Sequence, residues 1–230
     1  MALDPLSVEA QTRLAEVLAD SVLDGMSNSR ANDLARAEAL VGEALAASPR
    51  SEAVHFAKGE ILRAQGRFKE AVPEFETVLT IDRNAAWAWF ALAHCKLRTG
   101  SVEEVIPLVE QAIRLSPRDP NIALMYFRIG EVHLLQSRAE EAISWLQKAR
   151  GVNPQYSFVR VFLASAYGLK GEIKQASAEL AEARRLSGNG SPASITAERA
   201  TFLATISPTI RPLFETTYLL GLRNAGLPEE

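Results

Sequence analysis

The sequence predicts an all-α solenoid built from antiparallel helix pairs. Segments of similar sequence recur at intervals of 34 to 37 residues, as at 113–117 (IRLSP), 149–154 (ARGVNP) and 183–188 (ARRLSG). Each of these segments follows a stretch with a small residue midway and a bulky apolar residue four positions later. A period near 34 is typical of stacked helix–turn–helix repeats. We therefore expect a long concave surface instead of a single active-site pocket.

The composition is that of a globular protein, with 47% hydrophobic and 23% charged residues in a chain of 230. The net charge of −3 and the absence of any Lys/Arg run longer than Arg184–Arg185 argue against nucleic-acid and membrane-surface partners. No stretch approaches the roughly 18–20 apolar residues of a membrane span, and the first residues lack the features of a secretory signal. Cys95 is the single cysteine, which favours a reducing, cytoplasmic location.

Four repeat units are expected at 52–85, 86–122, 123–156 and 157–188. The second unit is longer because Pro117 and Pro120 bracket a loop. Small residues such as Gly59 and Gly130 should let the second helix of a pair approach the first, and large residues should fill the space between units. Those large residues are Phe75, Val109, Leu146 and Leu180. The turn inside each pair should be left-handed at Gly66, Gly100 and Gly171, with Ser137 at the same place in the third unit.

The two ends depart from the period. Residues 1–51 are expected to form a degenerate unit, with helices over 7–23 and 31–47 and a long turn at 24–29. Residues 189–230 are expected to form a helical cap: a loop over 187–192, a helix over 194–204 and a last helix over 209–225. The last helix should have one apolar side, made by Leu213, Phe214, Thr217, Tyr218, Leu220 and Leu222. Atypical terminal units are expected because each has a single neighbour.

The repeats resemble the tetratricopeptide repeat (TPR). Residues that match its pattern include Gly59, Ala71, Trp89, Leu92, Ala142, Pro154, Tyr167 and Ala176. The resemblance implies a right-handed superhelix whose concave face is lined by the first helix of each pair. Its groove positions correspond here to Phe56, Glu60, Arg63, Trp87, Phe90, His94, Arg98, Phe127, Glu131, Phe158 and Val161, with Ser165 and Gly168 further along the fourth unit.

Phe56, Phe90 and Phe127 recur at one repeat position and predict an apolar ladder in the groove, with Trp87 as an aromatic anchor. The Lys and Asn of the carboxylate clamp that grips chaperone tails are absent from the corresponding positions. The expected ligand is therefore an apolar helix or extended segment, with a basic residue near Glu60 or Glu131. Alternatives are that some of the phenylalanines are core, or that the groove holds the chain's own last helix or a homo-oligomer mate.

The sequence gives little sign of catalysis, and we predict a non-enzymatic protein without a metal or cofactor. His55, His94 and His133 are evenly spaced, but they occupy different repeat positions and should not converge. Cys95 lies beside His94 in sequence, yet adjacent helix residues face different directions, so a packed thiol is expected. Phosphate-binding, dinucleotide-binding and zinc-protease motifs are absent.

A wider resemblance rests on 53–59 (AVHFAKG), 111–121 (QAIRLSPRDPN), 126–130 (YFRIG), 133–138 (HLLQSR), 181–187 (AEARRLS) and 214–230. These stretches resemble the C-terminal repeat half of bacterial class III adenylate/guanylate cyclases, and similar halves of winged-helix regulators. The resemblance implies a bacterial regulatory module without cyclase activity of its own. Three functions remain open: a peptide-binding scaffold, a self-associating or autoregulatory module, and part of a cyclase polypeptide.

Overall fold

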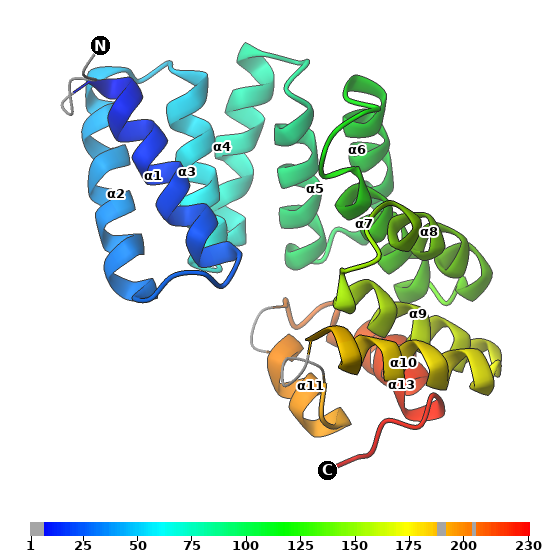
Figure 1. Ribbon diagram of the computed structural model, residues 1–230. Helices are drawn as coiled ribbons and strands as arrows, with labels where there is room; N and C mark the ends of the chain where they lie inside the picture. Colours follow the sequence, from blue (N-terminus) through cyan, green and yellow to red (C-terminus); the bar gives the residue numbers. More distant parts are fainter. Residues whose placement is uncertain (1–6, 188–191, 204–205) are drawn as a thin grey trace. The chain divides into compact units, whose positions relative to one another are not determined.

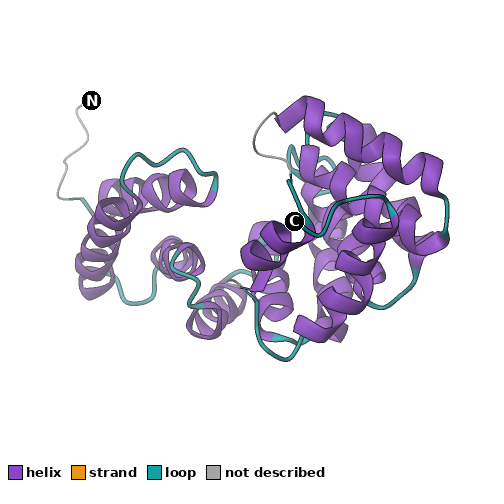
Figure 2. Ribbon diagram, turned by 90° about the horizontal axis from the view of Figure 1, so that it is seen from below, coloured by secondary structure: helices purple, strands orange, loops and turns teal. Residues whose placement is uncertain are grey.

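The computed structural model describes residues 7–187, 192–203 and 206–230. Helices joined by short loops make up this part of the chain, and it contains no strand (Figures 1 and 2). By its internal contacts the chain divides into two compact units, residues 1–96 (unit 1) and 97–230 (unit 2). The loop predicted at 187–192 falls largely on residues outside the described part.

Unit 1 is built from two helix pairs and most of a fifth helix (Figure 1). Their bounds are α1 Val8–Leu23, α2 Arg30–Ala47, α3 Glu52–Ala64, α4 Phe68–Ile81 and α5 Ala86–Thr99. The Ser7 and Ser51 side chains cap α1 and α3 by accepting hydrogen bonds from backbone N–H groups three residues on. The bounds of α1 and α2 lie within one residue of the ranges predicted from the sequence, 7–23 and 31–47.

Close packing inside the α3–α4 pair depends on Gly59. A Cβ atom added to Gly59 would lie 2.6 Å from the ring of Phe75, which is fully buried. The sequence expectation that a small residue here admits the second helix is confirmed. The rest of the unit 1 core is mainly small aliphatic: Ala15, Ala19, Ala37, Val41, Ala44, Val54, Ala57 and Ile61. Short side chains let the helix axes approach closely, as the ridges-and-grooves packing of helices requires.

Unit 2 holds the end of α5 and the remaining helices, which are α6 Val102–Leu115, α7 Ile122–Leu135, α8 Ala139–Val152, α9 Ser157–Lys170, α10 Ile173–Ser187, α11 Ile195–Leu203, α12 Arg211–Phe214, a π-helical turn η2 Glu215–Leu219, and α13 Leu220–Asn224. The bulky residues Val109, Leu146 and Leu180 are buried as expected. Gly130 repeats the role of Gly59, since a Cβ there would lie 2.7 Å from the Leu146 side chain.

The turns inside the pairs share one backbone conformation. Gly66, Gly100 and Gly171 have positive φ angles, as predicted. Ser137 occupies the same repeat position with φ of 61°, and it is the one non-glycine residue with positive φ in the described part of the chain. The left-handed region costs an L-residue roughly 1–2 kcal/mol, so this turn of the third unit is strained relative to the others.

The last helix is interrupted by the π-helical turn, which changes which side chains face inward. Phe214, Thr217, Tyr218 and Leu222 are buried, as expected for its apolar side. Leu220 was expected on that side and is 38% exposed, whereas its neighbour Leu219 is buried. The extra residue of the π turn rotates the following helix, so the prediction for Leu220 is wrong for a geometric reason.

No helix among the described residues is long and apolar enough to cross a membrane.

Candidate functional site

Three helices of unit 1 carry rows of side chains with helical spacing, and we call the surface they make the α1–α3–α5 face. Residues three or four positions apart lie on the same side of a helix. The rows are Arg13, Glu16 and Asp20 on α1; Phe56, Glu60 and Arg63 on α3; and Trp87, Phe90 and His94 on α5. Ring contacts and a polar contact link the α3 and α5 rows, and charge interactions link the α1 and α3 rows. Six of these nine residues were predicted as groove residues.

The aromatic part of the face centres on Phe56 and Trp87. Their ring centroids are 4.0 Å apart in an edge-to-face arrangement, and the Phe56 ring also lies 5.7 Å from Phe75 in the core. Phe56 is half-buried, while Trp87 is 41% exposed. Both rings line an open pocket of about 610 Å³, whose other walls are Arg13, Glu16, Ser51, Glu52 and Ala53. An aromatic side chain held by the core but open on one side is suited to anchoring a ligand.

The polar part of the face is a chain of contacts from Glu60 to His94. Arg63 donates from one guanidinium nitrogen to both carboxylate oxygens of Glu60, at 2.6 and 2.9 Å. Its other terminal nitrogen lies 3.1 Å from Nδ1 of His94. Glu60 is 4% exposed, so the carboxylate predicted to line the groove is buried under this ion pair. Arg63 and His94 are half-buried beside it.

The carboxylates of the face have raised pKa values. Burial raises the pKa of Glu60, and the charges of Asp20 and Glu16 add to the rise while Arg63 opposes it. Burial also raises the pKa of Glu16, which Arg13 lowers and Asp20 raises. The pKa of Asp20 is raised by burial and then by Asp24. Three carboxylates therefore lie close together on a surface that is partly shielded from water, and Arg13 and Arg63 do not fully offset their negative charge.

The α1 row was missed by the sequence analysis. Its unit is degenerate and its first helix is displaced from the repeat frame, so no groove position could be carried onto it. The available signal was the spacing of Arg13, Glu16 and Asp20, which are three and four residues apart on one helix.

In unit 2, the groove positions of the third repeat are buried. Phe127 is 8% exposed, because the rings of Phe158 and Phe162 both meet it edge-to-face at 4.9 Å. Glu131 is 1% exposed and forms a buried ion pair with Arg128. The prediction that these two residues line an open groove is therefore wrong: Phe56 and Phe90 are half-buried, whereas Phe127 is buried.

Two groove positions of the fourth repeat, Ser165 and Gly168, lie against the last helix of the chain. The Ser165 hydroxyl donates to the carbonyl of Tyr218 at 2.8 Å, and the rings of Phe162 and Tyr218 are 4.4 Å apart. The amide of Asn224 donates to the carbonyl of Gly168. Val161 is buried, and Phe158 remains 36% exposed. The expectation of an exposed Val161 is wrong, since its side chain is packed inside unit 2 and is 5% exposed.

Arg98 lies at the start of unit 2 and has a different role. Its carbonyl accepts a hydrogen bond from the backbone N–H of Ser207, at 3.0 Å. Beside it, Gly100 contacts Thr209, which would lie 3.2 Å from a Cβ added to the glycine. Arg98 therefore marks where the C-terminal segment meets the end of α5, and its side chain is half-buried.

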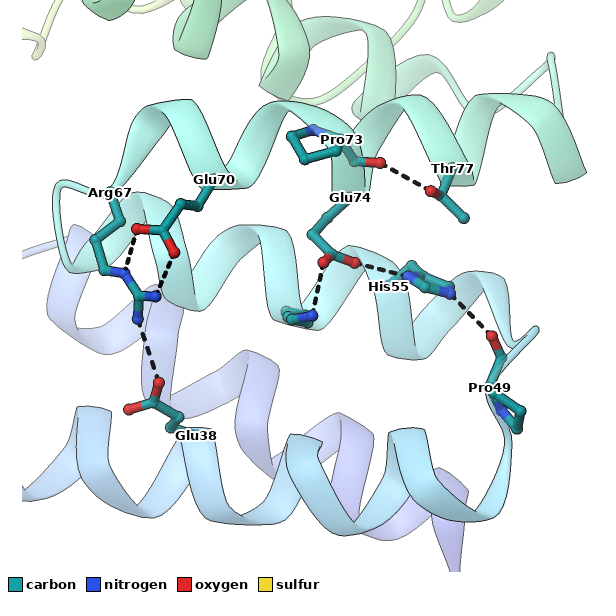
Figure 3. A network of polar contacts seen from close by, with 9 residues as sticks. Glu38, Pro49, His55, Arg67, Glu70, Pro73, Glu74 and Thr77 are labelled. Carbon is teal, nitrogen blue, oxygen red and sulfur yellow. Dashed lines mark hydrogen bonds and ion pairs between the residues drawn. The ribbon is translucent and has the colours of Figure 1, made fainter.

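His55 belongs to a separate polar network that ties α2, α3 and α4 together (Figure 3). Glu74 accepts a hydrogen bond from His55 and forms an ion pair with Lys58, each at 2.7 Å, while Arg67 pairs with Glu70 and with Glu38. His55 and His94 thus have different partners within unit 1. Within the described residues no group of three or more His, Cys, Asp or Glu is arranged to hold a metal ion. Cys95 is buried, as expected for a packed thiol.

Comparisons with known proteins agree with this geometry. Three family models, each described as tetratricopeptide repeat, match residues 25–86, 62–126 and 123–156. Together they run without a gap from residue 25 to residue 156, over half of the chain. The chain is a tetratricopeptide repeat protein. The sequence prediction of an all-α tetratricopeptide solenoid is confirmed.

Solved structures of other TPR proteins have the same fold. TTC0263 of Thermus thermophilus is 17% identical with a TM-score of 0.63, over 86% of this chain and 98% of that one. MamA of Desulfovibrio magneticus RS-1 is 18% identical with a TM-score of 0.60, over 81% and 100%. YrrB, described as a TPR protein with an unusual peptide-binding site, is 14% identical with a TM-score of 0.54, over 81% and 98%. A search of curated protein sequences found no match.

These matches concern repeats, so they establish the fold and the family. The resemblance to cyclases and winged-helix regulators stays a prediction.

Proposed function

We propose that this TPR protein is a protein–protein interaction scaffold that binds a peptide or short helix of a partner on its α1–α3–α5 face. The observation that carries the proposal is Trp87, which is 41% exposed beside Phe56 in an open pocket. Aromatic anchors in such pockets dominate the energy of many interfaces. The solved structure of YrrB, with its peptide-binding site, provides a precedent on the same fold. Binding needs no catalytic step, cofactor or metal.

The test is a selection of peptides on the full chain followed by one substitution. Dodecapeptides displayed on phage would be enriched on the purified protein, then synthesised with a fluorophore and titrated by anisotropy. Trp87→Ala should weaken their binding at least about tenfold, the effect of losing roughly 1.4 kcal/mol. The control is Ile81→Ala, which removes an apolar side chain that is 48% exposed elsewhere in unit 1. Equal binding by both variants and the unaltered chain would reject the α1–α3–α5 face.

A second candidate function is autoregulation by the last helix, as part of a larger bacterial regulator or cyclase polypeptide in a reducing compartment. It is favoured by the hydrogen bond from Ser165 to the Tyr218 carbonyl, since the last helix then covers groove positions of the fourth repeat. Release of that helix would uncover Phe162 and the rest of that surface. The helix would act in place of an external ligand, and a second copy of the chain could supply it.

Removal of residues after Ser207 should then add a second peptide-binding surface or change the mass measured by light scattering. Because the shortened chain could aggregate, Gly221→Ala in the full chain is the companion variant: it should loosen the same helix without removing it. Unchanged mass and unchanged peptide binding in both would reject autoregulation. Nucleotide cyclisation by the isolated chain is easily assayed, and we expect none.

A further inference from the structure

We infer that the preferred ligand of the α1–α3–α5 face is a basic peptide segment: an apolar side chain enters the pocket beside Trp87, and a Lys or Arg two residues away along an extended ligand lies over Glu16 and Asp20, beside the buried Glu60. The inference rests on the proposed function and specifies its ligand. It adds the sign and the placement of charge, which an apolar groove by itself does not determine.

The first argument is the charge of the surface. Four carboxylates lie on the face or line its pocket, namely Glu16, Asp20, Glu52 and Glu60. The cationic side chains there are Arg13 and Arg63, so the face carries two uncompensated negative charges before His94 is counted. A ligand of opposite charge is attracted at long range and fits without unpaired charge at contact.

The second argument is that both arginines are already engaged. Arg13 pairs with Glu16 at 2.8 Å, and Arg63 pairs with Glu60 and contacts His94. Asp20 and Glu52, by contrast, form no ion pair with any of the described residues. The negative charge is thus available to a ligand, whereas the positive charge is largely used within the face.

The third argument is the raised pKa of the carboxylates, which burial and mutual repulsion produce at Glu16, Asp20 and Glu60. A cation brought within about 4–6 Å favours the ionised form of each group. It therefore recovers part of the free energy lost to burial and repulsion in the free protein. An anion would increase the same repulsion, and a neutral ligand would leave it unchanged.

The order of the side chains along the helices gives the spacing in the ligand. Phe56 is followed one turn later by Glu60, and Glu16 is followed one turn later by Asp20. Four residues of α-helix advance about 6 Å, the same distance as about two residues of an extended peptide. Since the pocket is lined by Phe56, Trp87 and Glu16, the apolar anchor and the basic residue should be separated by one residue.

The experiment uses the enriched dodecapeptides and the full chain. The expected peptides share an apolar residue with a Lys or Arg two positions away from it, on either side, and bind more weakly as NaCl rises from 20 to 300 mM. The double variant Glu16→Gln with Asp20→Asn should bind them about tenfold more weakly. Its matched control, Glu140→Gln with Glu141→Gln, removes two charges from the exposed start of α8 in unit 2 and should bind as the unaltered chain does.

The outcomes separate the two proposals. Peptides that depend on Trp87 but are acidic or uncharged would overturn the basic ligand and leave the scaffold function intact. The same holds if the Glu16/Asp20 variant binds the basic peptides as tightly as its control does. If no peptide is enriched on the unaltered chain above the level found on the Trp87→Ala variant, both the site and its ligand are rejected.

Discussion

Gly168 of α9 and Gly221 of α13 lie at a helix crossing where the two backbones touch. A Cβ atom added to Gly168 would lie 2.0 Å from the carbonyl oxygen of Gly221, and one added to Gly221 would lie 2.2 Å from the carbonyl oxygen of Ser165. Contact with backbone atoms cannot be relieved by a side-chain rotation. The docking of the last helix on the fourth repeat therefore depends on both glycines.

Gly168→Ala should accordingly detach or shift the last helix. Overpacking in a close contact costs typically about 1–3 kcal/mol, and this contact is with the main chain. We expect a loss of at least about 2 kcal/mol in the free energy of unfolding of unit 2, with faster amide exchange over residues 211–224. Gly151→Ala in α8 is the control, because nothing lies within 4 Å of an added Cβ there. Alanine at that exposed helical position should raise the free energy of unfolding by up to about 1 kcal/mol. An equal loss of stability in both variants would therefore contradict the close crossing of the two helices.

Ser137→Gly should stabilise the third repeat. Ser137 has φ of 61°, in the left-handed region that glycine adopts without strain and that glycine does adopt at Gly171. We expect the free energy of unfolding to rise by about 0.5–1 kcal/mol. The gain is smaller than the strain removed, because glycine increases the conformational entropy of the unfolded chain. Urea unfolding followed by far-UV circular dichroism measures the change. Gly171→Ser is the reciprocal variant and should lose a similar amount; if both variants unfold at the unaltered midpoint, strain at this turn is absent.

Much of the fold was predictable because the signals are local and repeated. The turn residues Gly66, Gly100 and Gly171 are set by the left-handed backbone of the turn, and the small residues Gly59 and Gly130 by contacts within one helix pair, so the same pattern recurs along the repeats. Phe56 and Trp87 were found for the same reason. Their exposure follows from the repeat frame, and unit 1 places no further segment of the described chain over Trp87.

The errors come from contacts that the period does not encode. Phe127 is buried by Phe158 and Phe162, which belong to the next repeat, and Val161 is buried in a fourth repeat that packs against a helix some 50 residues further along. The exposure of Leu220 depends on the π-helical turn, which no local residue pattern predicts. The charged row on α1 was missed because its unit departs from the repeat.

Tyr218→Phe should destabilise unit 2 by an amount that depends on pH. The Tyr218 hydroxyl donates to the Glu198 carboxylate; burial raises the pKa of Glu198, and this hydrogen bond lowers it. A carboxyl group whose pKa is raised in the folded protein stabilises the fold at pH values below its ordinary pKa of 4.5. This stabilisation is lost as the pH rises through the pKa of the folded state. Without the hydroxyl the pKa rises further, so the loss should be larger at pH 7, about 1.5–3 kcal/mol, than at pH 4.

The control for Tyr218→Phe is Tyr167→Phe in α9. The Tyr167 hydroxyl accepts a hydrogen bond from the uncharged Gln147 amide, at 2.8 Å. Its removal should cost about 0.5–1.5 kcal/mol at both pH values. Chemical unfolding at pH 4 and pH 7 checks this difference. A Tyr218→Phe loss that is the same at both pH values would show that the ionised carboxylate is not what the hydroxyl stabilises.

Binding of a basic peptide to the α1–α3–α5 face should release protons near pH 5. Glu16, Asp20 and Glu60 have pKa values raised above 4.5 for glutamate and 3.8 for aspartate, chiefly by burial, so a fraction of these groups is protonated there. The charged groups that act on them are Arg13, Arg63 and Asp24. A ligand cation favours the ionised forms, lowers the three pKa values and expels protons, and the affinity should therefore increase as the pH rises through the raised pKa values of the free protein. Titration calorimetry at pH 5 in acetate and in a buffer of different ionisation enthalpy gives the number of protons released. Glu16→Gln with Asp20→Asn should reduce that number, and proton uptake by the unaltered chain would show that the ligand increases the negative charge on this face.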